Sequence, residues 1–137
     1  MNVVLVDTGP IVALLDRAQP QHRQCVEVLG ALRAPLVTCE AVLAEACYLV
    51  RKLKGAAGDL LSDVGRGRYL VPYRLADRSA AVVRLMAKYA DTPMDLADAC
   101  LVDLATQLKT GRIVTLDSDF RVYRWDRNRP FDLLLDL

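Results

Sequence analysis

The chain has 137 residues, of which 53% are hydrophobic and 26% are charged. This mix is typical of a folded globular protein and excludes collagen-like and disordered chains, and the length fits one domain spanning residues 1–137. Eighteen Lys and Arg against seventeen Asp and Glu give a net charge of +1, so the overall charge favours no class of partner, and nucleic-acid binding would require local basic clusters.

The N-terminal segment MNVVLVDTGP has no cationic region, and Asp7 interrupts its apolar run. We therefore expect neither a signal peptide nor a membrane span, and a cytoplasmic location. The cysteines contain no CxxC pair, and the single histidine, His22, is not spaced to complete a zinc site with them. We expect all four to be small buried hydrophobic residues: Cys25, Cys39, Cys47 and Cys100.

The first predicted unit is a buried strand followed by a helix. Residues 2–6 (NVVLV) are a continuous apolar, β-branched run of the kind that a parallel sheet buries on both faces. Thr8 is the expected N-cap of the next helix, and Pro10 is tolerated in its first turn.

The middle of the chain predicts further helices and strands in alternation. Residues 40–54 (EAVLAEACYLVRKLK) form the strongest helix of this part, with basic residues at its C-terminal end, where they suit the helix dipole. The other elements expected here are a helix at 22–33, a strand at 36–39, a short helix at 58–64, a basic loop at 65–68 and a strand at 69–71.

The C-terminal part predicts two more helices and a strand. The helices cover 77–90, with Asp77 as N-cap, and 95–109, closed by Gly111; the strand covers 112–116. The tail, 120–137, mixes aromatic and apolar residues around a loop at 126–130. We expect its large side chains to pack against an edge of the sheet or a dimer interface: Tyr123, Trp125 and Phe131. Alternating strands and helices without repeats or linkers predict an α/β fold, with a parallel sheet covered on both faces.

Two of the predicted strands end in acidic residues. Asp7 follows the first strand directly, and Asp117 follows the strand at 112–116, with Asp119 two residues further on. Ligands of open α/β sheets bind beyond the carboxyl ends of strands. Asp7 alone could equally open the turn through an Asx-type hydrogen bond, but two strand ends with acids point to a site.

Glu45 is one of only three glutamates and lies among apolar neighbours at helical spacing, which are Ala41, Val42, Tyr48 and Leu49. A carboxylate that faces a core is costly unless it is paired or binds a metal. Glu45 is therefore a candidate ligand, the alternative being an edge position from which the carboxylate reaches solvent.

The segment MDLADACLVD contains three acids that helix spacing separates. Asp98 has apolar residues at i+3, i+4 and i+7, so its face is mostly apolar. Asp95 follows Thr92-Pro93 and is a natural N-cap, which places Asp98 at the N3 position of a capping box. Asp103 has polar residues one and two turns ahead and is expected on the solvated face.

Asp7, Glu45, Asp98 and Asp117 thus come from two strand ends and two helix faces. Their mutual repulsion would be destabilising without a cation, and an all-oxygen site suits Mg²⁺ or Mn²⁺. A single histidine supports no Ser-His-Asp or Cys-His arrangement, and the phosphate-binding GxxxxGK[ST] motif is absent. Hydrolysis of a phosphodiester by metal-activated water is the chemistry that remains.

Four segments in this order resemble the PIN-domain ribonucleases, and among them the VapC-like toxins of toxin-antitoxin pairs: VLVDTGPIVALLD, LVTCEAVLAEACYLV, DLADACLVDLA and IVTLDSDFRVY. The resemblance covers nearly the whole chain. It implies a three-layer α/β/α sandwich with a mainly parallel central sheet, endoribonuclease activity dependent on Mg²⁺ or Mn²⁺, inhibition by a small antitoxin protein, and a homodimer.

The resemblance also implies roles for individual residues. By position, the family's acidic quartet corresponds to Asp7, Glu45, Asp98 and Asp117. Thr8 and Thr115 would support the metal site. Asp119 is an alternative to Asp117 as the fourth acid, and Asp95 is a further acid that would contact a second metal or a water.

An acidic site needs basic residues at its rim to bind RNA, because the substrate is itself negatively charged. The candidates, each of which is otherwise an ordinary surface charge, are Arg51, Lys52, Lys54, Arg66, Arg68, Arg112, Arg121, Arg124 and Arg127.

Two other functions are compatible with parts of the pattern. A haloacid-dehalogenase-like phosphatase requires a second Asp two residues after the first, and Gly9 occupies that position. A catalytically silent PIN-like scaffold that binds RNA or a protein is the second alternative, although a protein without activity has no reason to keep four carboxylates that repel one another.

Overall fold

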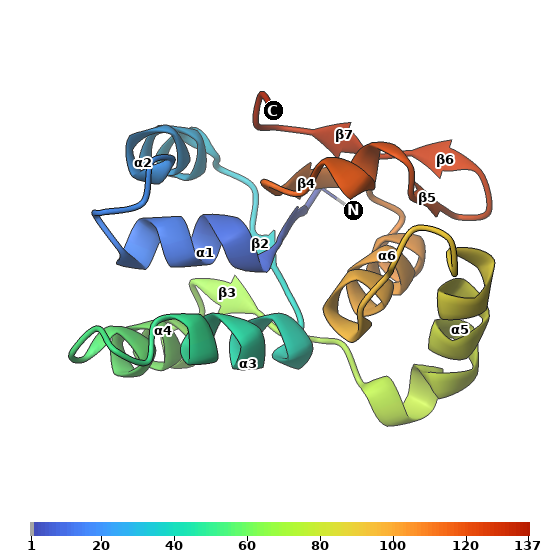
Figure 1. The fold of residues 1–137 in the computed structure, drawn as a ribbon, viewed down its shortest axis with the longest axis horizontal. Helices are drawn as coiled ribbons and strands as arrows, with labels where there is room; N and C mark the ends of the chain where they lie inside the picture. Colours follow the sequence, from blue (N-terminus) through green and yellow to red (C-terminus); the bar gives the residue numbers. More distant parts are fainter. Residues whose placement is uncertain (1) are drawn as a thin grey trace.

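The computed structural model describes residues 2–137, and its centre is a five-stranded sheet in the order β3-β2-β1-β4-β7 (Figure 1). The strands are β1 (Val4–Val6), β2 (Leu36–Val37), β3 (Tyr69–Leu70), β4 (Arg112–Val114) and β7 (Asp132–Leu133). Every pairing in this sheet is parallel. The predicted parallel sheet is therefore confirmed, with the apolar β1 fully buried at its centre.

Helices cover both faces of the sheet. They are α1 (Thr8–Leu15), α2 (His22–Ala31), α3 (Glu40–Leu49), α4 (Ala56–Gly65), α5 (Leu75–Lys88) and α6 (Leu96–Leu108). Figure 1 shows α1 to α4 on one side of the strands and α5 and α6 on the other, which is the expected three-layer arrangement. Helix α6 packs between the sheet and α5, so its residues from Ala97 to Ala105 are all buried. No helix among residues 2–137 has the length and apolarity needed to cross a bilayer.

Two of the predicted helix caps are wrong. The N-cap of α1 is Asp7 and not Thr8, because the Asp7 carboxylate accepts a hydrogen bond from the Thr8 backbone N–H. Helix α5 begins at Leu75, earlier than expected, with Arg74 as N-cap. Asp77 therefore lies in the first turn, where its carboxylate pairs with Arg74 at 2.9 Å.

The predicted ends of α3 and α6 also differ from the structure. Helix α3 ends at Leu49, so Arg51, Lys52 and Lys54 lie in the turns after it and not in its last turn. Helix α6 ends at Leu108, and its C-cap Lys109 adopts the left-handed conformation (φ 54°) expected of Gly111. Gly111 has another role: a Cβ there would collide with the Trp125 indole, so only glycine fits.

The tail contributes to the fold of the molecule itself. It contains a 3₁₀ helix, η1 (Ser118–Arg121), the antiparallel hairpin of β5 (Arg124–Trp125) and β6 (Arg129–Pro130), and then β7 at the edge of the main sheet. Its aromatic residues belong to the core, with Tyr123 completely buried beside Phe120 and Tyr89. Packing at the sheet edge is thus confirmed, whereas burial within the chain contradicts a dimer interface built from Tyr123, Trp125 and Phe131. The cysteines are free thiols, all buried except the half-buried Cys47.

Candidate metal centre

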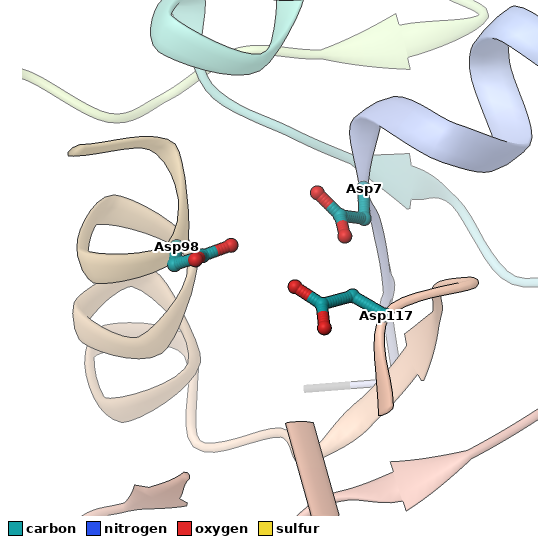
Figure 2. Close-up of side chains that lie close together, drawn as sticks. All are labelled: Asp7, Asp98 and Asp117. Carbon is teal, nitrogen blue, oxygen red and sulfur yellow. The ribbon is translucent and has the colours of Figure 1, made fainter. Parts of the chain in front are cut away.

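Three carboxylates converge at the carboxyl edge of the sheet. Asp7 follows β1 and Asp117 follows β4, and these strands are neighbours in the sheet with Val6 opposite Val114. Asp98 reaches the same point from the first turn of α6, and Figure 2 shows the three side chains pointing toward one another. One oxygen from each carboxylate lies within 4.8 Å of the others. Such a group is close enough to hold one cation.

Asp7 is held in place through both of its carboxylate oxygens. Oδ1 accepts a hydrogen bond from the Thr8 backbone N–H at 2.8 Å, and Oδ2 accepts one from the Thr115 hydroxyl at 2.7 Å. Only 7% of the residue is exposed. The carboxylate also lies at the N-terminus of α1, where the helix dipole favours negative charge.

Asp98 is oriented by the start of its own helix. Asp95 caps α6 by accepting a hydrogen bond from the Asp98 backbone N–H at 2.8 Å, and Asp98 Oδ2 accepts one from the Asp95 N–H at 3.3 Å. The reciprocal capping box expected at this position is therefore present. The Tyr123 hydroxyl also approaches Asp98 Oδ2 at 3.3 Å, so a side chain from the tail helps to fix this carboxylate.

Asp117 is the N-cap of η1, and its carboxylate accepts a hydrogen bond from the Asp119 backbone N–H at 2.9 Å. The Asp117 N–H donates to the Thr115 hydroxyl at 3.0 Å. Thr115 therefore links two of the acids, since it also bonds to Asp7. Asp119 contributes its backbone to this network and is not part of the carboxylate group.

Glu45 lies at the rim of the site and not in a core. The residue is exposed, and its apolar neighbours differ, because Val42 is completely buried whereas Tyr48 and Leu49 are more than half exposed. The stripe on α3 therefore faces the interior only in part. Its position still brings it to the same cavity as the three aspartates. Glu45 as a metal ligand therefore stays a prediction, and the structure shows the alternative position considered for it, an edge from which the carboxylate reaches solvent.

The cavity has a volume of about 300 Å³ and is lined by Asp7, Thr8, Gly9, Glu45, Leu49, Asp95, Asp98, Leu116 and Asp117. None of the Lys and Arg side chains among residues 2–137 lines it. The Thr8 hydroxyl is buried here without a hydrogen-bond partner among residues 2–137. Its unpaired oxygen and the surrounding carboxylates form an all-oxygen donor set, which is the chemistry that Mg²⁺ and Mn²⁺ prefer.

The electrostatics of the cavity also fit a cation. Burial, with the charges of Asp117 and Glu45 as smaller causes, raises the pKa of Asp7 to about 6 against the lowering effect of its hydrogen bonds. Burial, together with the carboxylates of Asp95 and Asp7, raises the pKa of Asp98 to about 8. A bound divalent cation would favour the ionised forms of both residues and remove the cost of placing them together.

Asp103 has an entirely different environment from the one its sequence neighbours indicated. It is 4% exposed, and its carboxylate accepts hydrogen bonds from the Tyr73 hydroxyl at 2.7 Å and from two Arg78 nitrogens at 2.8 Å. The expected solvated charge is therefore a buried ion pair between α6 and α5. Its partners lie 25 and 30 residues away in the chain, beyond the reach of a helix pattern.

The basic residues proposed for the rim lie elsewhere, since none lines the cavity. Arg66 and Arg68 precede β3, and Arg112 begins β4, so they lie toward the opposite edge of the parallel sheet from the acids. Arg51 stacks on Tyr48, with its guanidinium 3.9 Å from the ring centre. Lys52, Lys54 and Arg121 are exposed, and Arg121 bonds to a backbone oxygen of the C-terminal residue.

Tyr123 is the site residue that the sequence did not indicate. The sequence places Tyr123 in a tail of aromatic and apolar residues, and only the fold brings its hydroxyl to Asp98, 25 residues away. Leu49 and Leu116, which line the cavity, were likewise not singled out. No local pattern marks any of these three as part of a site.

The fold and the acidic site define this chain as a member of the PIN domain family, whose model matches residues 4–126. The chain is 31% identical to ribonuclease VapC26 of Mycobacterium tuberculosis over 116 residues, which cover 83% of this chain and 86% of the relative.

Two solved structures share the fold. The crystal structure of M. tuberculosis VapC20, a sarcin-ricin loop cleaving toxin, has a TM-score of 0.81 at 18% identity and covers 93% of this chain and 99% of that one. The crystal structure of Rickettsia felis VapBC2 bound to a promoter DNA fragment has a TM-score of 0.60 at 18% identity, with 96% of each chain covered.

Proposed function

We propose that this protein is a divalent-metal-dependent endoribonuclease of the VapC type, the toxin half of a toxin-antitoxin pair. The convergence of Asp7, Asp98 and Asp117 at the carboxyl edge of the sheet is the observation that carries the proposal. Membership in the PIN domain family and the likeness to ribonuclease VapC26 support it.

Asp7, Asp98 and Asp117 would hold Mg²⁺ or Mn²⁺, with Glu45 and Asp95 at the rim of the cavity. When bound there, the cation supplies activation of water for attack on an RNA phosphodiester and stabilisation of the developing charge. Thr115 keeps the Asp7 carboxylate aimed into the cavity, and Thr8 offers a further oxygen beside it. The capping box and Tyr123 hold Asp98 in the matching orientation.

The remaining features of the proposal follow from the same assignment. A small antitoxin would inhibit the protein, and the shared fold with a solved VapBC structure makes this partner the first to test by co-expression. A homodimer is proposed for the active form, and light scattering of the purified chain measures its oligomeric state.

An RNA substrate would place the protein in the cytoplasm. The continuous sheet through β7 supports treating residues 1–137 as one domain.

Cleavage of a labelled RNA tests the proposal directly. The sarcin-ricin loop is a suitable first substrate, because the structurally similar VapC20 is described as cleaving it. We expect cleavage in Mn²⁺ or Mg²⁺, none in EDTA, and a loss of about 100-fold or more in Asp98→Asn, since a metal supplies several kcal/mol of transition-state stabilisation. Asp136→Asn is the matched control, because it removes an exposed acid far along the chain from the site.

Two results would overturn the proposal. One is an Asp98→Asn protein that cleaves as well as the unchanged chain. The other is stabilisation by Mn²⁺ without cleavage of any structured RNA, which would favour the catalytically silent scaffold.

A further inference from the structure

Helices α5 and α6 and the turn between β5 and β6 lie next to one another (Figure 1, right). Residues of these three elements line another cavity, on the α5 side of α6. It has a volume of about 260 Å³ and is lined by four basic side chains and a single acid. We call it the basic cleft, and its polar residues are Arg78, Arg84, Lys88, Arg127, Asp103 and Thr106.

Most of the positive charge in the basic cleft is uncompensated. Arg78 is neutralised by its two hydrogen bonds to Asp103. In contrast, Arg84, Lys88 and Arg127 form no ion pair with any acid of residues 2–137. Arg84 and Lys88 are four residues apart on α5, which places them about 6 Å apart along one face of the helix. Three cationic side chains without an acidic partner among residues 2–137 therefore line the basic cleft.

The turn that carries Arg127 is fixed in place by both helices. The Lys88 ammonium donates a hydrogen bond to the Arg127 carbonyl at 3.1 Å, and the Asp126 N–H donates to the Thr106 hydroxyl at 2.8 Å. Asp126 and Arg127 both adopt left-handed backbone conformations, with φ of 45° and 74°. Positive φ values are what the short loop of a β-hairpin requires, so this turn has the ordinary geometry of the β5–β6 hairpin.

The ligand that fits this arrangement is a chain of phosphates. The cavity at the metal centre has acids but no Lys or Arg in its lining, so an RNA strand gains no side-chain charge neutralisation where it is cut. The basic cleft can supply this charge neutralisation close to the metal centre. Asp98 of the metal centre and Thr106 of the basic cleft are eight residues apart on α6, or about 12 Å along the helix axis. An RNA of a few nucleotides beyond the cleaved bond spans that distance.

We propose that the basic cleft binds the sugar-phosphate backbone of the RNA substrate at a point removed from the cleaved bond. The proposal rests on the endoribonuclease function proposed above. It assigns substrate affinity to Arg84, Lys88 and Arg127, and cleavage to the acidic cavity.

Fluorescence anisotropy with a fluorescein-labelled RNA stem-loop tests this assignment. The measurement uses Asp98→Asn protein in EDTA, so that no cleavage occurs, over a range of salt concentrations. The test variant is Arg84→Gln with Arg127→Gly, in which glycine also relieves the left-handed backbone. The control is Arg17→Gln with Arg33→Gln, which removes the same charge from exposed side chains after α1 and α2.

We expect the test variant to bind RNA about tenfold more weakly, and its plot of log affinity against log salt to become shallower by about 0.7 to 1 for each lost contact. The control should bind as the unchanged chain does, and both variants should melt normally. Equal weakening in the control, or no weakening in the test variant, would overturn the proposal. A test variant that no longer binds a duplex DNA of similar length but still binds the RNA would also overturn the proposal.

Cleavage kinetics separate this inference from the proposed function. If the inference holds, the test variant placed on the otherwise unchanged chain cleaves RNA with a raised KM and an unchanged kcat. An unchanged KM overturns the inference and leaves the nuclease intact. A chain that binds RNA through the basic cleft but cleaves none in Mn²⁺ overturns the nuclease function alone.

Discussion

Asp98 combines a structural and an electrostatic role in one side chain. It completes the capping box of α6, accepts a hydrogen bond from Tyr123 and lies beside the carboxylates of Asp95 and Asp7. Burial and these two charges raise its pKa to about 8. In the metal-free protein, Asp98 is therefore mostly protonated at neutral pH, whereas a metal ligand must be ionised.

Asp98→Asn should remove a pH dependence of stability from the metal-free protein. A carboxyl with a raised pKa binds its proton more tightly in the folded state than in the unfolded state, where the value is 3.8. The free energy of unfolding therefore falls as the pH rises from about 4 through 8, by at most about 1.4 kcal/mol per pH unit for one proton. Between pH 6 and 8 this slope belongs to Asp98, because Asp7 has a pKa of about 6.

Urea unfolding in EDTA at several pH values measures the effect. Asp98→Asn should show a flat profile between pH 6 and 8 and should exceed the unchanged chain in stability at pH 8.5. Parallel profiles for the two proteins would contradict the assignment of this slope to Asp98.

Thr115 supports the site without being an acid. Its hydroxyl donates to Asp7 Oδ2 and accepts from the Asp117 N–H, so Thr115→Val leaves both groups without this partner at nearly constant volume. We expect a loss of about 10-fold to 100-fold in metal affinity, as for other groups that orient metal ligands. The Mn²⁺ concentration that gives half-maximal cleavage measures this loss. Thr115→Ser should restore affinity, and failure of Ser to do so would show that the methyl group matters instead.

At the scale of the element, α6 determines what each of its three acids does. Its first turn directs Asp98 to the metal centre and Asp95 to the helix N-terminus, and its next turns bury Asp103 against α5. The Asp103 carboxylate ties α6 to Arg78 of α5 and to Tyr73 in the segment before that helix. This contact holds α6 in the position from which Asp98 reaches the other acids.

Asp103→Ala should destabilise the protein by about 3 kcal/mol, because it leaves Arg78 and Tyr73 without their acceptor. A solvated charge would change the free energy of unfolding by less than about 0.5 kcal/mol. Urea unfolding distinguishes these two values. Asp132→Ala, on an exposed residue, is the control.

Two variants of Asp95 distinguish a helix-capping role of this residue from a role in catalysis. Asp95→Ala should lower the free energy of unfolding by about 1 kcal/mol through loss of the N-cap, and Asp95→Ser should recover most of it, because serine also caps helices. If Asp95 acts only as a cap, the serine variant cleaves RNA at the normal rate. A slow serine variant with normal stability would instead give the carboxylate, which lines the cavity, a direct part in catalysis.

The sequence predicted those elements whose pattern is local and missed contacts that depend on remote partners. The apolar runs of β1 and β4 and the cap at Asp95 could be identified from neighbours in the chain. The positions of Asp7 and Asp117 followed from the ends of these strands. The burial of Asp103 depends on α5, and the contact of Tyr123 with Asp98 depends on how the tail folds back, so neither leaves a periodic signal. Glu45 shows the reverse case, since its apolar stripe is buried at Val42 but exposed at Tyr48 and Leu49, so the local pattern predicted more burial than the fold provides.

Across the whole molecule, the net charge of +1 is a sum that includes one acidic region and one basic region. The acids that line the metal centre face a cavity without cations, and the basic cleft gathers cations that have no acidic partner among residues 2–137. Both regions contact α6, so this buried helix sets the distance between them. Net charge is therefore a poor guide to the partner, because complementary fields act locally over about a Debye length.

Metal binding should stabilise the whole fold, and more strongly at high pH. Mn²⁺ competes with protons for Asp7 and Asp98, whose raised pKa values of about 6 and 8 mean that binding at pH 6 must displace protons. At a concentration 100 times its Kd, a ligand adds about 2.7 kcal/mol of stability, or roughly 8 °C in Tm for a chain of this size.

We therefore expect a Tm difference between Mn²⁺ and EDTA that is small at pH 6 and approaches roughly 8 °C by pH 8.5. Scanning calorimetry at fixed Mn²⁺ measures it, with Asp98→Asn losing most of the difference and Asp136→Asn keeping it. The same difference at every pH would show that Mn²⁺ binds acids that are already ionised, such as those at the surface. In that case Asp7 and Asp98 would not hold the metal, and the convergence of carboxylates at the carboxyl edge of the sheet would need another explanation.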